Sequence, residues 1–393
     1  MRNVTGQVVR GEDFFDREHE QARFWRDLET DNLLLLAPRR VGKTSLMRRL
    51  GEAAPDKGFT AVFVDVSDAG GEAIFVGRLY EAVLETEASN PLWIQMEKSW
   101  LGKLVRRVKK LSGAGFSVEF DPGQAGDWST LGRDLAEALS GLEGRWLLQI
   151  DELPVFILKL LNDGDAARER VREFLYWMRR LRLGFPAVRW MLAGSIGLDT
   201  VTARLNVADA INDLRIVSLG AFEPDTAHAL LSRLSETYGI DLPAPVRERI
   251  IQRMGWPVPY YLQLILHGLR DRTESGKTAT EDDIEQVISV LLDPAHKGYF
   301  DYWRQRLFDE LGRPDADHAK RVLDAAARDP DGASRVTLSQ VLSKSIADPD
   351  GREDKLRYLL DVLENDGYLV EHAGRWRFRF PLLREYWLKR VAS

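Results

Sequence analysis

The chain has 393 residues, 44% of them apolar and 30% charged, and its formal net charge is -6. It contains no cysteine, which excludes disulfides, thiolate metal sites and cysteine nucleophiles. This length predicts two or three domains. Its apolar runs are far shorter than the roughly 20 residues that a membrane span requires. The first residues also lack the apolar core of a signal peptide, so we expect a cytoplasmic protein with no membrane partner.

Strand-like and helix-like segments alternate over the first two-thirds of the chain. Short apolar or β-branched runs predict strands at 32–37, 59–66, 145–150, 188–193 and 215–219. A helix is predicted at 166–181, where apolar residues recur at spacings of three and four. This alternation is typical of a three-layer α/β domain with a parallel sheet, and we place that domain at 1–219.

A segment at about 89–126 interrupts the alternation. It contains an amphipathic helical pattern whose cations, with no acid between them, are Lys98, Lys103, Arg106, Arg107, Lys109 and Lys110. Two interpretations stay open. The helix either packs on the domain core with a solvated basic side, or it contacts nucleic acid or an acidic partner.

Helical patterns dominate after residue 219. We predict a small helical lid domain at 220–295 and a further domain at 296–393. In the latter, helices are expected at 318–328, 337–344 and 354–365, then strands around 368–371 and 375–380 with a turn at Ala373–Gly374. That order resembles a winged helix.

The most specific motif is APRRVGKTS at residues 37–45, between a predicted strand and a predicted helix. In that position, successive backbone N–H groups and a helix N-terminus can converge on a phosphate. Gly42 lets the backbone approach, Lys43 reaches the phosphates, and the Thr44 hydroxyl can ligate Mg²⁺. Ala37 replaces the usual first glycine of the motif. The predicted nucleotide-binding residues of this loop are Pro38, Arg39, Arg40, Val41, Gly42, Lys43, Thr44 and Ser45.

Two later strands end in polar residues. LLQIDE places Asp151 and Glu152 after an apolar strand, where burial of two carboxylates is costly unless a cation or a reaction uses them. We predict that Asp151 holds magnesium and that Glu152 deprotonates the attacking water. Ser195, after the strand at 188–193, is a candidate sensor of the γ-phosphate. Alternatively, Ser195 is an ordinary serine in a glycine-rich turn.

Several motifs together resemble the STAND-type branch of AAA+-related ATPases, close to the prokaryotic origin-recognition and initiator group. They are FFDRE at 14–18, the 37–45 loop, LLQIDEL, AGSIGL, INDLRIVSLGAF, the GWP turn at 255–257 and the winged-helix-like end DGYLVEHAGRWRFRFPLLREYW at 366–387. The resemblance covers nearly the whole sequence. It implies a strand order in which the strand before Ser195 lies between the strands of the two main motifs.

The resemblance also implies further site residues. Phe15, Arg17 and Glu18 would lie beside the adenine, although Asp16 stands where the family has a glycine. Pro257 would pack on the base and ribose, unless its turn is only a junction between helices. Arg204 or Arg215 would be the arginine finger or sensor, acting within the chain or on a second copy.

The last strand alternates arginines with aromatic residues. Its period of two predicts one solvent-facing side of Arg375, Arg377 and Arg379 and one packed side of Trp376, Phe378 and Phe380. The arginine side would suit a nucleic-acid-binding wing. However, acidic and basic residues are equally numerous in 301–393, whereas DNA-binding domains are usually basic. A packing or signalling module therefore remains the alternative.

The sequence thus predicts an ATP/ADP- and Mg²⁺-binding ATPase of slow turnover. Its nucleotide state would set the position of the lid and winged helix, and so self-assembly or the binding of a partner protein. The alternative is a DNA-loading ATPase of the initiator or transposition-regulator kind. A scaffold that has lost hydrolysis is disfavoured because Lys43, Asp151 and Glu152 are all retained.

Overall fold

The computed structural model describes residues 1–86, 128–164, 166–194, 198–272 and 277–392. The predicted basic helix and Ser195 lie outside these residues. The chain forms two compact units. We call Arg17–Leu36 with Leu46–Ser218 the sheet unit, and Met1–Asp16, Ala37–Ser45 and Leu219–Ser393 the helical unit. The division into three domains at 219 and 295 stays a prediction.

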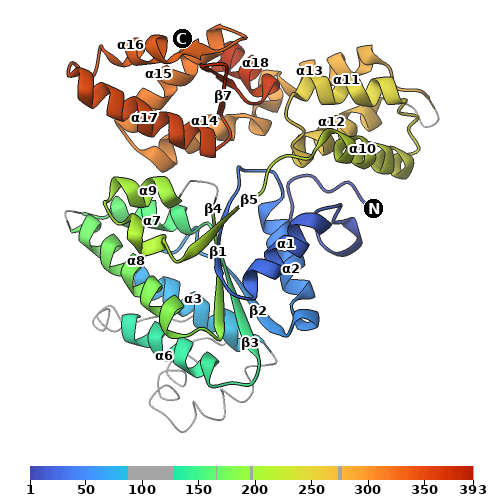
Figure 1. Ribbon diagram of the computed structural model, residues 1–393. Helices are drawn as coiled ribbons and strands as arrows, with labels where there is room; N and C mark the ends of the chain where they lie inside the picture. Colours follow the sequence, from blue (N-terminus) through green and yellow to red (C-terminus); the bar gives the residue numbers. More distant parts are fainter. Residues whose placement is uncertain (87–127, 165, 195–197, 273–276, 393) are drawn as a thin grey trace. The chain divides into compact units, whose positions relative to one another are not determined.

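The sheet unit is built on five parallel strands in the order β2-β3-β4-β1-β5 (Figure 1). The strands are β1 (Asn32–Leu36), β2 (Phe59–Asp65), β3 (Arg145–Asp151), β4 (Val188–Gly194) and β5 (Leu214–Ser218). Each predicted strand is confirmed to within one residue at either end. The order also confirms that β4 lies between β1 and β3, as the family resemblance implies.

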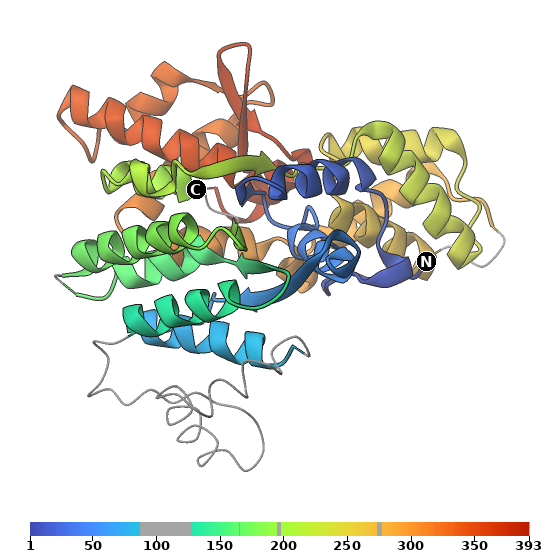
Figure 2. The ribbon, with the colours of Figure 1, turned by 60° about the horizontal axis from the view of Figure 1, so that its bottom comes forward.

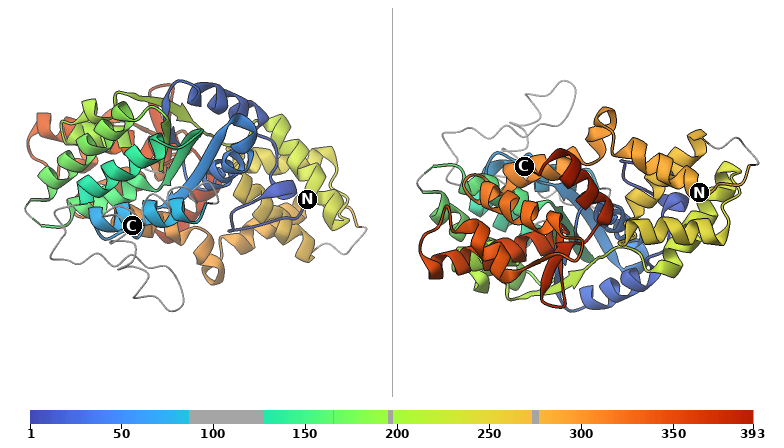
Figure 3. Two further views of the ribbon diagram at one scale, coloured as in Figure 1. Left: turned by 90° about the horizontal axis from the view of Figure 1, so that it is seen from below. Right: turned by 90° about the horizontal axis from the view of Figure 1, so that it is seen from above.

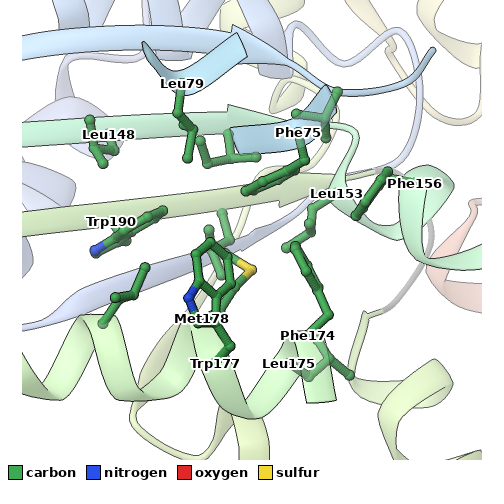
Figure 4. Close-up of a cluster of buried hydrophobic side chains, with 14 of the residues drawn as sticks. Phe75, Leu79, Leu148, Leu153, Phe156, Phe174, Leu175, Trp177, Met178 and Trp190 are labelled. Carbon is green, nitrogen blue, oxygen red and sulfur yellow. The ribbon is translucent and has the colours of Figure 1, made fainter. Parts of the chain in front are cut away.

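Helices cover both faces of this sheet, as a parallel sheet requires (Figure 1; Figure 3, left). They are α1 (Glu18–Leu28), α2 (Lys43–Ala53), α3 (Glu72–Leu84), α6 (Trp128–Ser140), α7 (Leu153–Leu161), α8 (Ala167–Gly184) and α9 (Leu198–Arg204). The face under α3, α6, α7 and α8 holds the main apolar core (Figure 4). There Phe75 of α3 packs against Phe156 and Phe174, at centroid distances of 5.3 and 5.0 Å.

After residue 219, the helical unit continues with a bundle of four described helices (Figure 3, right). These helices are α10 (Pro224–Tyr238), α11 (Ala244–Met254), α12 (Pro259–Arg272) and α13 (Glu281–Leu291). Left-handed glycines end two of them, at Gly239 and Gly255, because a residue without a Cβ adopts that conformation freely. A capping box formed by Thr280 and Asp283 starts α13.

The remainder of the helical unit has the element order of a winged helix. Its elements are α14 (Asp301–Leu311), α15 (Asp315–Arg328), β6 (Ala333–Ser334), α16 (Arg335–Leu342), α17 (Pro349–Asn365), β7 (Leu369–His372), β8 (Arg375–Phe378) and α18 (Pro381–Arg390). Strands β7 and β8 form an antiparallel hairpin that projects from the helices (Figure 2). Ala373 and Gly374 make its turn with positive φ angles of 48° and 75°, as the sequence predicts.

One aromatic core joins the bundle to the winged helix. Tyr261 of α12 stacks on Phe300 and packs against Phe380, at centroid distances of 5.4 and 4.4 Å. Its hydroxyl accepts a hydrogen bond of 2.8 Å from the indole N–H of Trp303. Because these buried rings come from both parts, the bundle and the winged helix are held as one body. No described helix has the combined length and apolarity needed to cross a membrane.

Candidate functional site

The 37–45 loop follows β1 directly, and α2 begins within it at Lys43. Arg40 and Gly42 both have left-handed backbone angles, with φ of 67° and 96°. Buried Val41 anchors the loop, and Lys43 is only 6% exposed. Apart from Gly42 itself and its two chain neighbours, no described residue has an atom within 4 Å of where a Cβ on Gly42 would stand. The loop therefore fits a group that approaches the backbone closely at Gly42, as a bound phosphate does.

The amino-terminal segment is fastened to this loop. The backbone N–H of Val9 donates a hydrogen bond of 3.0 Å to the Ser45 hydroxyl. Six residues earlier, the side-chain amide of Asn3 donates to the backbone carbonyl of Gln263 in α12, at 2.9 Å. Sequence analysis assigned Ser45 to the nucleotide alone. In the structure its hydroxyl also holds the amino-terminal segment beside the loop.

Arg40 directs its side chain onto two tyrosine rings. Its guanidinium carbon lies 3.7 Å from the ring centroid of Tyr260 in α12 and 4.1 Å from that of Tyr302 in α14. Burial lowers the pKa of Arg40, but the neighbouring tyrosine hydroxyls raise it on balance. The guanidinium therefore stays charged and interacts with both the ring faces and the hydroxyls of its tyrosine neighbours.

Pro38 is held by a second set of contacts. A Cβ added to Gly367, where φ is +83°, would lie 3.1 Å from the Pro38 Cβ and 2.9 Å from the Trp256 ring. Only glycine accommodates this close approach without strain. The guanidinium carbon of Arg379 lies 5.2 Å from the centroid of the Trp256 ring. The loop thus lies against Gly367 of the winged helix, and Trp256 of the 255–257 turn lies against the same glycine.

Phe15 and Pro257, the two residues of the helical unit that are predicted to lie beside the adenine, both contact Phe222. Phe15 packs edge-on against Phe222, with ring centroids 6.2 Å apart. The backbone N–H of Phe222 donates a hydrogen bond of 3.0 Å to the carbonyl of Pro257. Sequence analysis did not single out Phe222, although it ends the INDLRIVSLGAF motif. The sequence feature that could have identified Phe222 is a large aromatic residue just before the first helix of the bundle, which begins at Pro224.

Arg17 belongs to the sheet unit and precedes α1. It is buried, adopts a left-handed φ of 75°, and pairs with Glu20 at 2.6 Å. Asp16 also has a positive φ, of 60°. This explains why a glycine suits that position in the family, because glycine adopts such angles at no steric cost. The expected contacts of Phe15, Arg17 and Glu18 with adenine stay a prediction.

The two carboxylates of the second motif lie at the carboxyl end of β3. Asp151 is 1% exposed, and its Oδ1 accepts a hydrogen bond of 2.9 Å from the backbone N–H of Glu152. Glu152 is half-buried and has a left-handed φ of 58° just before α7. In a parallel sheet, Asp151 and the β1 residue before the loop, Leu36, lie at the same edge.

Gln149 is a site-supporting residue that sequence analysis missed. It lies buried in β3, and its side-chain amide donates a hydrogen bond of 2.7 Å to the backbone carbonyl of Met47 in α2. This contact fixes α2, the helix that the loop leads into, against the strand that carries Asp151. A polar residue inside the apolar run LLQI was the signal for it.

Two arginines, Arg204 and Arg215, are predicted as the sensor or the arginine finger, and the structure describes the side chain of only the second. Arg204 is the last residue of α9, and its side chain lies outside the described part of the structure. Arg215 does not sit at the carboxyl edge of the sheet. It is registered opposite Leu33 near the start of β1 and pairs with Asp27 at 3.2 Å and Asp31 at 3.4 Å. Its acidic partners therefore hold it toward the amino end of β1, which corrects the expectation of a nucleotide contact within the same chain.

The three arginines of the wing are not equally exposed to solvent. Burial of Trp376, Phe378 and Phe380 confirms the predicted packed side. On the other side, Arg375 pairs with Asp329 at 2.6 Å, and Arg379 lies 3.7 Å from Glu364 and over the ring of Trp256. Arg377 is exposed. The three arginines therefore differ in exposure. Arg375 still exposes 41% of its side chain beside Asp329, whereas the Arg379 side chain, beside Glu364 and Trp256, exposes 25%.

The comparisons with known proteins bear on the fold. No protein-family model matches the chain, and no curated protein sequence matches it. Among solved structures, it is similar to the Walker-type ATPase PABY2304 of Pyrococcus abyssi. That structure has a TM-score of 0.63 at 19% identity, over 98% of this chain and 99% of the other. The ORC2 protein of Aeropyrum pernix, solved in ADPNP–ADP complexes, has a TM-score of 0.56 at 14% identity, over 96% and 95%.

These similarities define the class of fold. The chain has the three-layer P-loop architecture of Walker-type and ORC proteins, with a helical and winged-helix region after it. Among the described residues, no group of three or more His, Asp or Glu is arranged to hold a metal ion by itself.

Proposed function

We propose that the protein is an ATPase that binds ATP with magnesium and hydrolyses it slowly. The observation that carries the proposal is the 37–45 loop, with left-handed Arg40 and Gly42 and buried Lys43, placed directly after a strand of a parallel sheet. The fold shared with a Walker-type ATPase supports it. So does the pair Asp151 and Glu152 at the end of β3.

In this proposal each residue has a defined task. Backbone N–H groups of the loop and the Lys43 ammonium bind the phosphates. Bound Mg²⁺ would neutralise charge on the phosphates, and Thr44 and Asp151 are the residues that would hold it. Glu152 takes a proton from the attacking water, whose oxygen forms the new bond to the γ-phosphorus. The bond to the bridging oxygen breaks, and its electron pair leaves with ADP.

The proposed consequence of turnover is a switch of the STAND type. The helical bundle and winged helix share one aromatic core, so they would respond to the nucleotide as one body rather than as two. Arg253 reinforces that junction, because it bonds Glu385 of α18 at 2.8 Å and Glu285 of α13 at 2.9 Å. The switch would then control self-assembly or the binding of a partner protein. Phe15, Arg17, Phe222 and Pro257 would form the adenine side of the site.

A second candidate function is DNA loading of the initiator kind. The fold shared with an ORC protein and the exposed Arg377 favour it, as do the cations at 98–110. The equal numbers of acids and bases in 301–393 weigh against it. We therefore rank the switch first.

Calorimetry and turnover assays test the proposed ATPase. Lys43→Ala should abolish binding of a non-hydrolysable ATP analogue, whereas Lys57→Ala, an exposed lysine in the turn after α2, should leave the affinity unchanged. Glu152→Gln should bind normally and lose turnover by about 100-fold or more. Exposed Glu173→Gln is its control. Unchanged affinity in Lys43→Ala would refute the loop as the phosphate site, and normal turnover in Glu152→Gln would remove Glu152 as the base.

A further inference from the structure

Arg40, in the middle of the 37–45 loop, contacts two tyrosine rings. Its backbone has a φ of 67°, an angle that residues other than glycine rarely adopt. Its side chain is half-buried between Tyr260 and Tyr302, at 3.7 and 4.1 Å from the ring centroids. A backbone angle of this kind persists where surrounding contacts hold it, and the two rings supply such contacts.

The rings themselves are fixed by the core that joins the bundle to the winged helix. The hydroxyl of Tyr302 lies 3.2 Å from that of Tyr261, which in turn accepts the hydrogen bond from the Trp303 indole. Tyr260 packs edge-on against Tyr261 at 5.1 Å. Any movement of α12 and α14 relative to the loop would therefore carry both ring faces away from the guanidinium.

We propose that Arg40 is a positioning residue that couples the shape of the 37–45 loop to the helical bundle and the winged helix, through the rings of Tyr260 and Tyr302. This inference rests on the proposed nucleotide binding and adds its regulation. With the guanidinium between both rings, the backbone N–H groups around Arg40 and Gly42 keep the conformation that receives phosphates. A shift of α12 and α14 together, away from the loop, releases the arginine and weakens nucleotide binding.

Thermodynamic linkage makes the coupling reciprocal. If the state of α12 and α14 changes the affinity for nucleotide, then nucleotide must change the state of those helices by the same factor. Pro38 provides a parallel contact through Gly367 and Trp256. Because that contact does not involve Arg40, removing the arginine side chain should weaken the coupling without detaching the loop.

The test is nucleotide binding by the full chain, measured by calorimetry with Mg-ADP and with a non-hydrolysable ATP analogue. Arg40→Gly removes the cation, and glycine adopts the left-handed backbone angle without strain. Tyr302→Leu removes one ring face, while Tyr302→Phe keeps it. We expect roughly tenfold weaker binding for Arg40→Gly and Tyr302→Leu, equivalent to about 1.4 kcal/mol, and nearly unchanged binding for Tyr302→Phe.

The matched control is Arg48→Gln. Arg48 lies on α2, and its guanidinium carbon is also 3.7 Å from an aromatic centroid, that of Phe63 in the sheet unit. Arg48→Gln removes the same kind of arginine–aromatic contact and leaves the contacts of Tyr260 and Tyr302 intact. Nucleotide affinity should therefore stay at the wild-type value, which separates a specific effect of Arg40 from a general loss of arginine–aromatic packing.

Hydrogen exchange gives a readout that a purely structural role would not move. In the wild type, added nucleotide should slow amide exchange in α12 and α14. In Arg40→Gly at saturating nucleotide, that response should be lost. Wild-type affinity in both Arg40→Gly and Tyr302→Leu, or a retained exchange response, would overturn the inference while leaving the ATPase proposal intact. A wild type that binds no nucleotide would overturn both. If Tyr302→Leu does not fold, the affinity and hydrogen exchange of Arg40→Gly alone decide the result.

Discussion

Gly194, the last residue of β4, lies directly against Pro154 in the first turn of α7. A Cβ added to Gly194 would stand 2.2 Å from the Cδ and 2.5 Å from the Cγ of Pro154. The proline ring is rigid, and the strand is fixed in the sheet by β1 and β3 on either side. The close approach of these two residues sets where α7 begins, and with it the backbone of Glu152.

Gly194→Ala should therefore lower both stability and turnover. Overpacking of this kind costs about 1–3 kcal/mol, and a shift of α7 moves the proposed base. Gly184→Ala is the control, since nothing lies within 4 Å of a Cβ at that position. The melting temperature and the ATPase rate of the two variants are the measurements. Equal melting temperatures for Gly194→Ala and the wild type would show that α7 moves freely away from β4.

Gln149 offers a graded test of the link between β3 and α2. Gln149→Leu removes the hydrogen bond to Met47 and should cost about 1 kcal/mol of unfolding free energy. Gln149→Glu places a carboxylate oxygen against the Met47 carbonyl in a buried site and should cost about 3 kcal/mol or more at neutral pH.

The second variant also has a defined pH dependence. Burial beside a carbonyl raises the pKa of the introduced carboxyl above its unfolded value. Stability is then highest at low pH and is lost as the pH rises through the folded pKa. Urea unfolding of Gln149→Glu and Gln149→Leu at several pH values measures this. A Gln149→Glu variant that is no less stable at pH 8 than at pH 5 would show that water or a cation reaches the site.

Glu285 gives a pH prediction for the native protein. Burial alone raises the pKa of its carboxyl, but hydrogen bonds from Arg253 and Arg249 lower it on balance below the ordinary value. A lowered folded pKa means that Glu285 stabilises α13 against α11 above its unfolded pKa, about 4.3. That contribution is lost as the pH falls through the folded pKa.

Glu285→Gln should therefore lower the melting temperature at pH 7 and make it less sensitive to acid below about pH 4.5. Glu236→Gln, whose partner Arg233 lies 3.8 Å away on an exposed helix face, is the control and should have little effect. Melting curves between pH 3 and pH 7 measure both variants. Parallel curves for Glu285→Gln and the wild type would contradict a lowered pKa of Glu285 in the folded protein.

The wing separates the two candidate functions. If it binds DNA, Arg377→Ala should weaken binding and lower the slope of log affinity against log salt by about 1, with no loss of stability. Arg375→Ala should mainly destabilise the winged helix, because it breaks the bond to Asp329 at 2.6 Å. Fluorescence anisotropy with duplex DNA at low salt is the assay. No binding by the wild type would leave only the switch.

Much of the fold followed from local pattern. The five strands were predictable because apolar runs of five to seven residues bounded by turn residues have few other uses. The turn at Ala373–Gly374 and the alternation of Trp376 and Phe378 with arginines fixed the wing for similar reasons. The short β6 was not predicted, since two residues carry no period. No helix was predicted for α18, although its buried residues Leu382, Leu383, Tyr386 and Trp387 lie at helical spacing.

The site was predictable only in its parts. The spacing of Gly42, Lys43 and Thr44 and the pair Asp151 and Glu152 determined the proposed chemistry, because few other residue types serve phosphate and magnesium. Only the tertiary structure decided what Arg40, Gln149 and Arg215 contact. Each of these side chains has its partner in another element of the fold, at Tyr302, Met47 and Asp27. A local sequence pattern encodes which residues form an element and not which distant ring, carbonyl or acid folding brings beside it.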